Sequence, residues 1–167
     1  ITITGNARLI MTANNTSIFS NTASGGNSRG GGIAVFGPAR ADIGSPGLGP
    51  FGAIHDNEAD FGGGVAVYAR NAPNVFEPAL VRFFTTVATR PVRIHGNRAR
   101  SLGGAGFARS DSNFAPDQAG LCVLDARVDD NVAPEGAALY LDTAFNAIGI
   151  NPVGSILSFN AGGFACE

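Results

Sequence analysis

The sequence contains no lysine and no tryptophan, and only 14% of its 167 residues are charged. Its basic residues are all arginines, and its formal net charge is −2. Because nucleic-acid-binding surfaces need dense clusters of basic side chains, this composition argues against nucleic acid as a partner. No apolar run approaches the roughly 20 residues of a membrane-spanning helix. We expect residues 1–167 to form one domain, and the start at Ile1 in strand-like sequence suggests a fragment of a longer chain.

Cysteine is also scarce, because only Cys122 and Cys166 occur. There is no CxxC pair, so the sequence does not indicate a cysteine-based zinc site. Both cysteines lie in strand-like stretches, LCVLDA and GGFACE, and alternation places each on an inward face. Two buried thiols that pack as small apolar groups and a single disulfide both fit this pattern. The redox compartment therefore stays open.

Glycine is abundant, with 24 residues, and it recurs in a fixed pattern. In each repeat an aliphatic residue, two variable residues and an asparagine are followed by glycines and a new apolar stretch. The repeats are SIFSNTASGGNSRGGGIAVF (17–36), AIHDNEADFGGGVAVY (53–68), RIHGNRARSLGGAGFA (93–108), RVDDNVAPEGAALYL (127–141) and a truncated ILSFNAGGFAC (156–166). Their asparagines are Asn21, Asn57, Asn97, Asn131 and Asn160. Internal repeats of this length indicate a stacked architecture.

Each repeat is built of short stretches rich in β-branched and aromatic residues, without helical periodicity. A third strand is predicted before the asparagine strand in three places, at residues 1–6, 79–84 and 121–126. The most compact unit, GLCVLDARVDDNVAPEGAALYLD, holds three such strands and is a plausible single coil. The segments 37–52, 69–78 and 109–120 are rich in Gly, Pro, Asn, Ser or Asp, and they predict long loop inserts.

Stacking in parallel register would place equivalent residues above one another. The aliphatic positions would then form one buried column, made of Ile18, Ile54, Ile94 and Val128. The asparagines would form a second column at a corner, where each amide can hydrogen-bond the next asparagine and the turning backbone. Asparagine also tolerates the left-handed conformation of a tight corner, and the glycines supply positive φ or close backbone approach. We therefore assign the asparagines and glycines a structural role.

The pattern resembles the right-handed parallel β-helix repeats of the polymorphic outer-membrane proteins and of related bacterial surface proteins of the CSLREA type. The matching pairs are IFSN (18–21) with GGGI (30–33), IHDN (54–57) with GGGV (62–65), IHGN (94–97) with GGAG (103–106), and VDDN (128–131) with EGAA (135–138). The first residue of the tetrad is usually Phe in the polymorphic proteins and is Ile or Val here. The predicted fold is thus all-β, a right-handed parallel β-helix of about five coils with long loop inserts.

This resemblance implies a secreted or cell-surface protein associated with the outer membrane, acting as a non-catalytic, adhesin-like scaffold. Its long loops are the candidate binding surface, with glycans or host and cell-surface proteins as partners and no cofactor. Open sheet ends promote association, so flanking regions or a partner chain are expected to cap them. The alternative is a polysaccharide-active enzyme, a lyase or glycoside hydrolase, because β-helices also carry such enzymes.

No catalytic residue is assigned. Asp129 and Asp130 are the only adjacent acidic pair, and His95–Gly96 resembles part of a polygalacturonase motif, but the order is reversed and the companion motifs are missing. The position two before the repeat asparagine is occupied by Phe19, His55, His95 and Asp129, which should form an outward column. His55 and His95, close to Asp56, could bind a sugar or a metal, or could be ordinary surface histidines without a third ligand.

Overall fold

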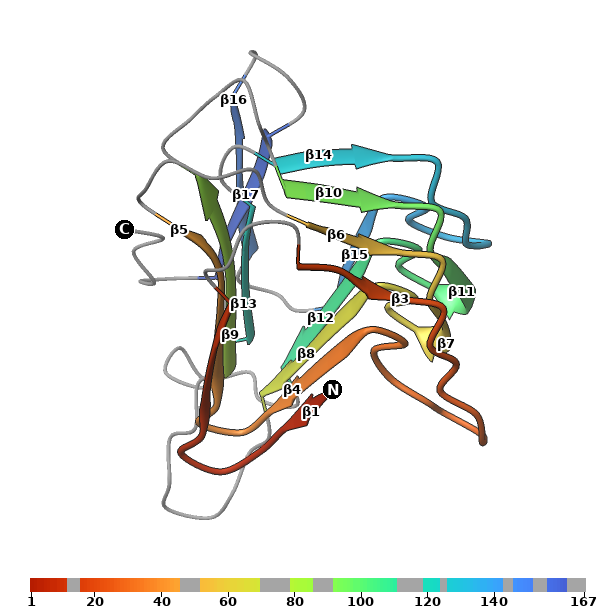
Figure 1. Ribbon diagram of the computed structural model, residues 1–167, viewed down its shortest axis with the longest axis horizontal. Coiled ribbons are helices and arrows are strands. Elements are labelled where there is room, and N and C mark those ends of the chain that lie inside the picture. Colours follow the sequence, from red (N-terminus) through yellow and green to blue (C-terminus); the bar gives the residue numbers. More distant parts are fainter. Residues whose placement is uncertain are drawn as a thin grey trace.

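The computed structural model describes residues 1–11, 16–45, 52–69, 79–85, 92–110, 119–123, 126–142, 146–151 and 156–161. Within these ranges all regular structure is β-strand, with no helix. Most strands pair in parallel, and they form stacked sheets that surround a shared interior (Figure 1). The predicted all-β, mainly parallel architecture is therefore confirmed at this level.

The strands belong to four sheets, which we name by their place in the repeat. The asparagine sheet contains the strands that lead to the repeat asparagine: β3 (Ile18–Phe19), β6 (Ala53–His55), β10 (Val92–His95) and β14 (Ala126–Asp129). The corner sheet follows it and contains β7 (Glu58–Phe61) and β11 (Arg98–Leu102). The glycine sheet contains β1 (Thr2–Ile3), β4 (Ile33–Phe36), β8 (Val65–Ala69), β12 (Gly106–Ser110) and β15 (Leu139–Asp142).

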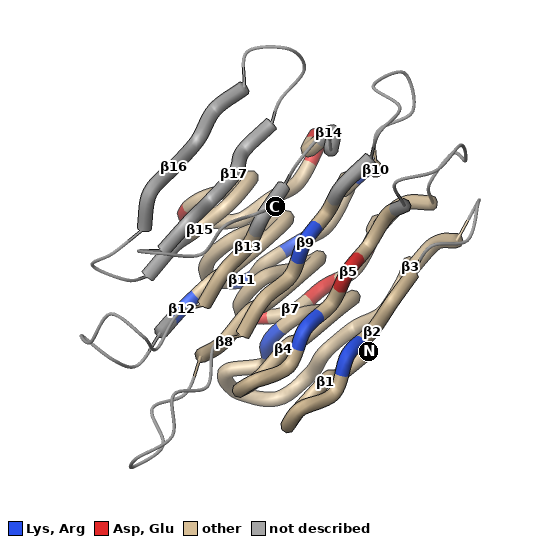
Figure 2. Tube along the Cα trace, turned by 90° about the vertical axis from the view of Figure 1, so that its left-hand side faces the viewer, with Lys and Arg blue, Asp and Glu red and all other residues tan. Residues whose placement is uncertain are grey.

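The fourth sheet contains six strands and faces the viewer in Figure 2. They are β2 (Arg8–Met11), β5 (Arg40–Ser45), β9 (Ala79–Thr85), β13 (Ala119–Val123), β16 (Asn146–Asn151) and β17 (Ile156–Ala161). We call it the third sheet, because it contains β9 and β13, which correspond to the predicted third strand of the repeat. From β3 to β13 the chain passes repeatedly from the asparagine sheet through the corner to the glycine sheet and then to the third sheet. We call each such passage a rung.

The rungs stack in the register that the repeat predicts. Ile54 pairs with Ile18 on one side and Ile94 on the other, and Ile94 pairs with Val128. Ile18, Ile54 and Ile94 are 7%, 2% and 1% exposed, and Val128 packs against the same core. The core receives side chains from the asparagine, glycine and third sheets, because alternate residues of each strand point to one interior. The predicted aliphatic column is thus confirmed.

The glycines after each corner have two different steric reasons. Gly62 has φ of 64°, and a Cβ on it would lie closer than 3.0 Å to the Val65 carbonyl oxygen. Gly63 is not among the glycines of positive φ, but a Cβ there would lie closer than 3.0 Å to the backbone of Arg98 in the next rung. The first glycine therefore makes the bend and the second allows two rungs to approach. Positive φ recurs at the equivalent residues Gly30, Gly103 and Gly136.

Three details of the predicted strands were wrong. The segment 37–52 is not only a loop, because it contains β5, which pairs with both β2 and β9. Residues 1–6 do not correspond to 79–84, since β1 pairs with β4 in the glycine sheet and β2 takes the place expected of it. The corner sheet was not expected at all. These short strands carry a mixed polar sequence, so they lack the apolar alternation from which a strand is recognised.

The C-terminal repeat also differs from the prediction. β17 pairs antiparallel with β13 and with β16, so the strands β16 and β17 form an antiparallel hairpin at the edge of the third sheet. The sequence ILSFNAGG was expected to start a fifth parallel coil in the asparagine sheet. The aliphatic-x-x-Asn pattern therefore does not by itself decide the direction in which a strand pairs.

Candidate functional site

The repeat asparagines Asn21, Asn57, Asn97 and Asn131 form a continuous hydrogen-bonded ladder. The backbone N–H and Nδ2 of Asn57 donate to Oδ1 of Asn97 at 3.1 and 3.0 Å, and the same pair of bonds links Asn21 to Asn57 and Asn97 to Asn131. The Nδ2 of each asparagine also donates to the carbonyl oxygen of the residue two positions earlier in the chain. From Asn57 onwards, Nδ2 donates in addition to the carbonyl oxygen of the aliphatic residue in the preceding rung. Asn57 and Asn97 are 1% and 0% exposed, so the ladder satisfies buried amides.

Asn160 is placed elsewhere. It lies in β17 and pairs with Ala147 of β16, not at a corner after an asparagine-sheet strand. The prediction that it forms the fifth step of the asparagine column is therefore corrected. Cys122 lies in β13, but its side chain is not described, and Cys166 lies outside the described residues. Whether the two cysteines are buried thiols or form a disulfide therefore stays a prediction.

The residue before each asparagine makes the left-handed turn. Ser20, Asp56, Gly96 and Asp130 have φ of 53°, 55°, 63° and 54°, whereas the asparagines do not appear among the residues of positive φ. The expectation that asparagine itself takes this conformation was wrong. Asp is among the residues that tolerate it best, so Asp56 and Asp130 have a conformational reason for their positions. Both side chains are exposed.

The outward column two residues before the asparagines is present in the predicted register. Phe19, His55, His95 and Asp129 are paired successively in β3, β6, β10 and β14. The Phe19 and His55 rings stack with centroids 5.1 Å apart, and the His55 and His95 rings follow at 5.0 Å with an angle of 2°. The three rings form one ladder along the outer face of the asparagine sheet.

The charged neighbours of this ring ladder are paired with one another. Nδ1 of His55 lies 2.7 Å from Oδ2 of Asp56. Arg93 donates to Asp129 at 2.9 Å, so a basic and an acidic side chain of adjacent rungs neutralise each other at its end. The structure brings His55, Asp56, His95 and Asp129 to one face, and it leaves Asp130 exposed at the corner.

The two histidines are poorly arranged for one metal ion. A histidine nitrogen binds a metal in the plane of its ring, and the planes of His55 and His95 are parallel to within 2°. Their lone pairs therefore do not converge. Within the described ranges no group of three or more His, Cys, Asp or Glu side chains could hold a metal ion.

An arginine that the sequence did not single out joins three rungs at the corner sheet. Arg100 donates to Asp60 and Glu58 at 2.6 Å each, to the carbonyl oxygen of Ala23 at 2.9 Å and to Ser28 Oγ at 3.2 Å. The hydrogen bond from Arg100 is the main reason why the pKa of Asp60 lies below its usual value. The spacing of 40 residues between Asp60 and Arg100 is the same as the spacing between Asn57 and Asn97, so the repeat register is the signal that could have brought them together.

A second ion-pair cluster lies on the third sheet. Asp42 is 3% exposed, and it accepts hydrogen bonds from Nε of Arg8 at 2.7 Å and Nε of Arg82 at 2.6 Å. Burial alone would raise the pKa of Asp42, but the hydrogen bonds and charges of Arg82 and Arg8 outweigh burial and hold this pKa below its usual value. The cluster ties β2, β5 and β9 together.

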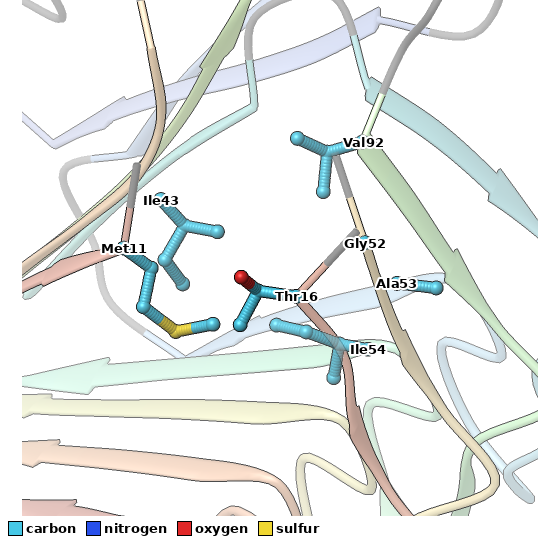
Figure 3. A pocket seen from close by; sticks show the side chains of 7 residues that line it. All are labelled: Met11, Thr16, Ile43, Gly52, Ala53, Ile54 and Val92. Carbon is cyan, nitrogen blue, oxygen red and sulfur yellow. The ribbon is translucent and has the colours of Figure 1, made fainter. Parts of the chain in front are cut away.

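One apolar pocket lies between the asparagine sheet and the third sheet (Figure 3). It is lined by Met11, Thr16, Ile43, Gly52, Ala53, Ile54 and Val92, and it measures about 260 Å³ including open solvent. Met11, Thr16, Gly52 and Val92 each begin or end a described range, so the pocket supports no ligand assignment.

No protein-family model, curated protein or solved structure significantly matches the chain. Among the described residues there is also no helix of the length and apolarity needed to cross a bilayer.

Proposed function

We propose that this chain is part of a right-handed parallel β-helix that serves as a non-catalytic scaffold at the bacterial cell surface. It would present its longer connections as a binding surface for glycans or for proteins of another cell. The observation that carries the proposal is the combination of constant register with connections of variable length.

Between successive parallel rungs the register is unbroken in the asparagine, glycine and third sheets, and it shifts only in the corner sheet, between Ala99 and Leu102. The asparagine ladder repeats the same two hydrogen bonds at spacings of 36, 40 and 34 residues. The chain between the glycine sheet and the third sheet, in contrast, consists of residues 37–39 in one rung, 70–78 in the next and 111–118 after that. A scaffold that holds its rungs in register and varies the length of its connections is a common arrangement for molecular recognition.

The charged side chains of the faces support a structural use. Arg93, Arg100 and Arg82 each form an ion pair with an acidic residue of another rung. A catalytic pair of carboxylates needs a defined separation and access to substrate. Here Asp129 is paired with Arg93, and Glu58 and Asp60 share Arg100, so these carboxylates strengthen contacts between rungs.

The test is a screen of the purified chain against glycans, polysaccharides and intact cells, reading both binding and cleavage. Two variants replace residues 70–78 or 111–118 by the short sequence Gly-Pro-Ala of residues 37–39. We expect binding by the parent, loss of binding in at least one variant, and an unchanged β-rich circular dichroism spectrum.

Two outcomes would contradict this proposal. Binding that survives both replacements would place the binding surface away from these connections. Release of reducing ends or unsaturated products, abolished by Asp129→Ala or His95→Ala, would establish the polysaccharide-active enzyme instead.

A further inference from the structure

The strands of the third sheet carry an uneven set of charges. Among all residues of its six strands only four are charged, and they lie in β2, β5 and β9: Arg8, Arg40, Asp42 and Arg82. Figure 2 shows neighbouring blue and red segments on these strands. Three arginines against one aspartate give the strands of this sheet a net charge of +2. We call the three arginines the arginine cluster.

The four charged side chains lie on the outer face of the sheet. Side chains alternate between the two faces of a strand. The residues that alternate with the charged ones belong to the core or pack against it: Leu9, Met11, Ala41, Ile43, Val81 and Phe83. The strands pair in register, with Arg8 opposite Arg40 and Asp42 opposite Arg82. The arginine cluster is therefore compact and faces away from the core.

Asp42 holds two of the arginines in place and is itself covered. Its Oδ2 accepts a hydrogen bond from Nε of Arg8 at 2.7 Å, and its Oδ1 accepts one from Nε of Arg82 at 2.6 Å. The side chain of Asp42 is 4% exposed, whereas those of Arg8 and Arg82 are 55% and 26% exposed. The acidic group thus lies beneath the basic groups, and the surface that solvent reaches here is positive.

Arg40 adds a charge that no other described residue neutralises. It is exposed, and it lies directly opposite Arg8 in the neighbouring strand. No hydrogen bond or ion pair joins its side chain to another residue in the described part of the chain. Like charges directly opposite each other destabilise a sheet. An anion bound between the two arginines would replace this repulsion by two attractions.

The charge and geometry of the arginine cluster favour a phosphate monoester over a carboxylate. Guanidinium groups bind both kinds of anion through paired hydrogen bonds. A carboxylate has a single charge and two oxygens in one plane. A phosphate monoester carries a charge of about −1.5 to −2 at pH 7 and has three acceptor oxygens. It therefore matches the net charge of +2 and offers an oxygen to each of the three arginines.

We propose that the arginine cluster on the outer face of the third sheet binds a phosphate monoester group, carried by a sugar or by a lipid headgroup. Arg8, Arg40 and Arg82 donate to the phosphate oxygens, and Asp42 orients Arg8 and Arg82 from below. Arg40 contributes most to selectivity, because its guanidinium group is not shared with Asp42. This site lies on a sheet face, and it does not rest on the proposed use of the longer connections.

The experiment titrates the full-length ¹⁵N-labelled chain with glucose 6-phosphate at constant ionic strength, so that screening by added ions does not change. We expect saturable chemical-shift changes at the Nε–Hε groups of Arg8, Arg40 and Arg82. Glucose 6-sulfate and glucuronate carry one negative charge at the same position of the sugar, and each should bind about tenfold more weakly.

The pH dependence of binding separates a dianion from a monoanion. The second pKa of a phosphate monoester is about 6, so lowering the pH from about 7 to about 5 should reduce the affinity for glucose 6-phosphate towards that for glucose 6-sulfate. Asp42 stays charged over this range, because its pKa lies below the usual 3.8. The affinity for glucose 6-sulfate should therefore stay constant.

Two matched variants locate the site. Arg40 and Arg98 are both exposed, and neither has an ion pair among the described residues, but Arg98 lies on the corner sheet. Arg40→Ala should weaken the binding of glucose 6-phosphate about tenfold, and Arg98→Ala should leave it unchanged. Because Arg40→Ala removes no hydrogen bond to a described residue, it should keep the parent's circular dichroism spectrum.

Vesicles distinguish the two sources of the phosphate group. Phosphatidic acid presents a phosphate monoester at a membrane surface, so the chain is sedimented with phosphatidylcholine vesicles that contain or lack phosphatidic acid. Binding that needs phosphatidic acid and is weakened by Arg40→Ala would assign the site to a lipid headgroup. Binding of glucose 6-phosphate without binding to these vesicles would assign it to a phosphorylated sugar.

Three results would overturn the proposal. One is the absence of saturable shifts with glucose 6-phosphate at about 10 mM. Another is equally tight binding of glucuronate, and the last is equal weakening by Arg40→Ala and Arg98→Ala. The proposed function fails separately, because phosphate binding should persist in the two variants with replaced connections, whatever those variants do to the binding of neutral glycans and proteins.

Discussion

Oδ1 of Asn97 accepts two hydrogen bonds from Asn57, one from its backbone N–H at 3.1 Å and one from its Nδ2 at 3.0 Å. Nδ2 of Asn97 in turn donates to the carbonyl oxygen of Ile54 at 2.9 Å and to Oδ1 of Asn131 at 2.9 Å. One buried amide thus contacts the rungs on both of its sides. It fixes the register at the corner, where the strand pairing of the asparagine sheet ends.

Replacement of Asn97 by alanine should therefore lower the free energy of unfolding by about 1–3 kcal/mol, because the backbone N–H of Asn57 and the carbonyl oxygen of Ile54 lose a partner and Oδ1 of Asn131 loses one of its two donors. Asn21→Ala is the matched control, since Asn21 is exposed and, among the described residues, forms the asparagine ladder only with Asn57. Urea unfolding followed by circular dichroism measures both. Equal losses for the two variants would show that burial and double-sided bonding are not what makes Asn97 important.

Gly63→Ala should be strongly destabilising, by about 1–3 kcal/mol or more, because its new Cβ would overlap the backbone of Arg98. Backbone atoms cannot rotate away as a side chain does, so the two rungs would have to separate. Gly26→Ala is the control: a Cβ there meets nothing within 4 Å. It should have little effect on thermal unfolding. Equal melting temperatures for Gly63→Ala and Gly26→Ala would show that the two rungs do not approach each other closely at Gly63.

The sequence predicted those parts of the fold that repeat at fixed spacing, because parallel register places equivalent residues together. Ile54 above Ile18 and His95 above His55 are examples, and neither needs knowledge of the strand lengths. The left-handed residue at the corner was misassigned to asparagine, because sequence alone does not show whether Asp56 or Asn57 turns the chain. The hairpin β16–β17 was missed since Asn160 satisfies the repeat pattern, while pairing direction depends on chain connections that the pattern does not contain.

Candidate binding residues were predicted less completely. The column of Phe19, His55, His95 and Asp129 followed from the spacing. The Arg100 network did not, because an arginine can reach several acidic residues and sequence does not rank them. Asp42 was missed because it lies in β5, within a segment that glycine and proline mark as loop.

Asp42→Asn should reduce stability at pH 7 by about 1–3 kcal/mol, since two charge-assisted hydrogen bonds lose their anionic acceptor. The pKa of Asp42 is lower in the folded chain than its usual value of 3.8. Its stabilising contribution is therefore fully present well above pH 3.8 and is lost as the pH falls through the lower folded-state pKa.

The measurement is urea unfolding of parent and Asp42→Asn between about pH 7 and pH 2. At the acidic end of this range the carboxyl group of Asp42 becomes protonated and is then uncharged, like the asparagine side chain. The stability difference should shrink as the pH decreases below 3.8. Asp130→Asn is the control, because Asp130 is exposed and asparagine accepts its positive φ of 54°. A difference between parent and Asp42→Asn that stays constant over this range would exclude the ion pairs as its cause.

Arg100→Ala should lower the melting temperature, and added salt should reduce the difference from the parent, because the ion pairs with Glu58 and Asp60 are open to solvent. Arg98→Ala removes a neighbouring exposed arginine from the same strand and should have a smaller effect. Differential scanning calorimetry at low and high salt compares them. If both variants melt alike, the contacts of Arg100 with three rungs contribute no more than an ordinary surface charge.

His95→Phe and His95→Ala separate the stacking of the ring ladder from its metal chemistry. Phenylalanine keeps a flat ring beside His55, so His95→Phe should retain the parent stability, whereas His95→Ala should lose about 0.5–1.5 kcal/mol. Because the parallel histidine rings do not converge on one ion, Zn²⁺ should shift the melting temperature of the parent no more than that of His95→Phe. A zinc-dependent stabilisation that is present in the parent and lost in His95→Phe would mean that His55 and His95 rearrange to bind the metal, and the ring ladder would then not be their resting arrangement.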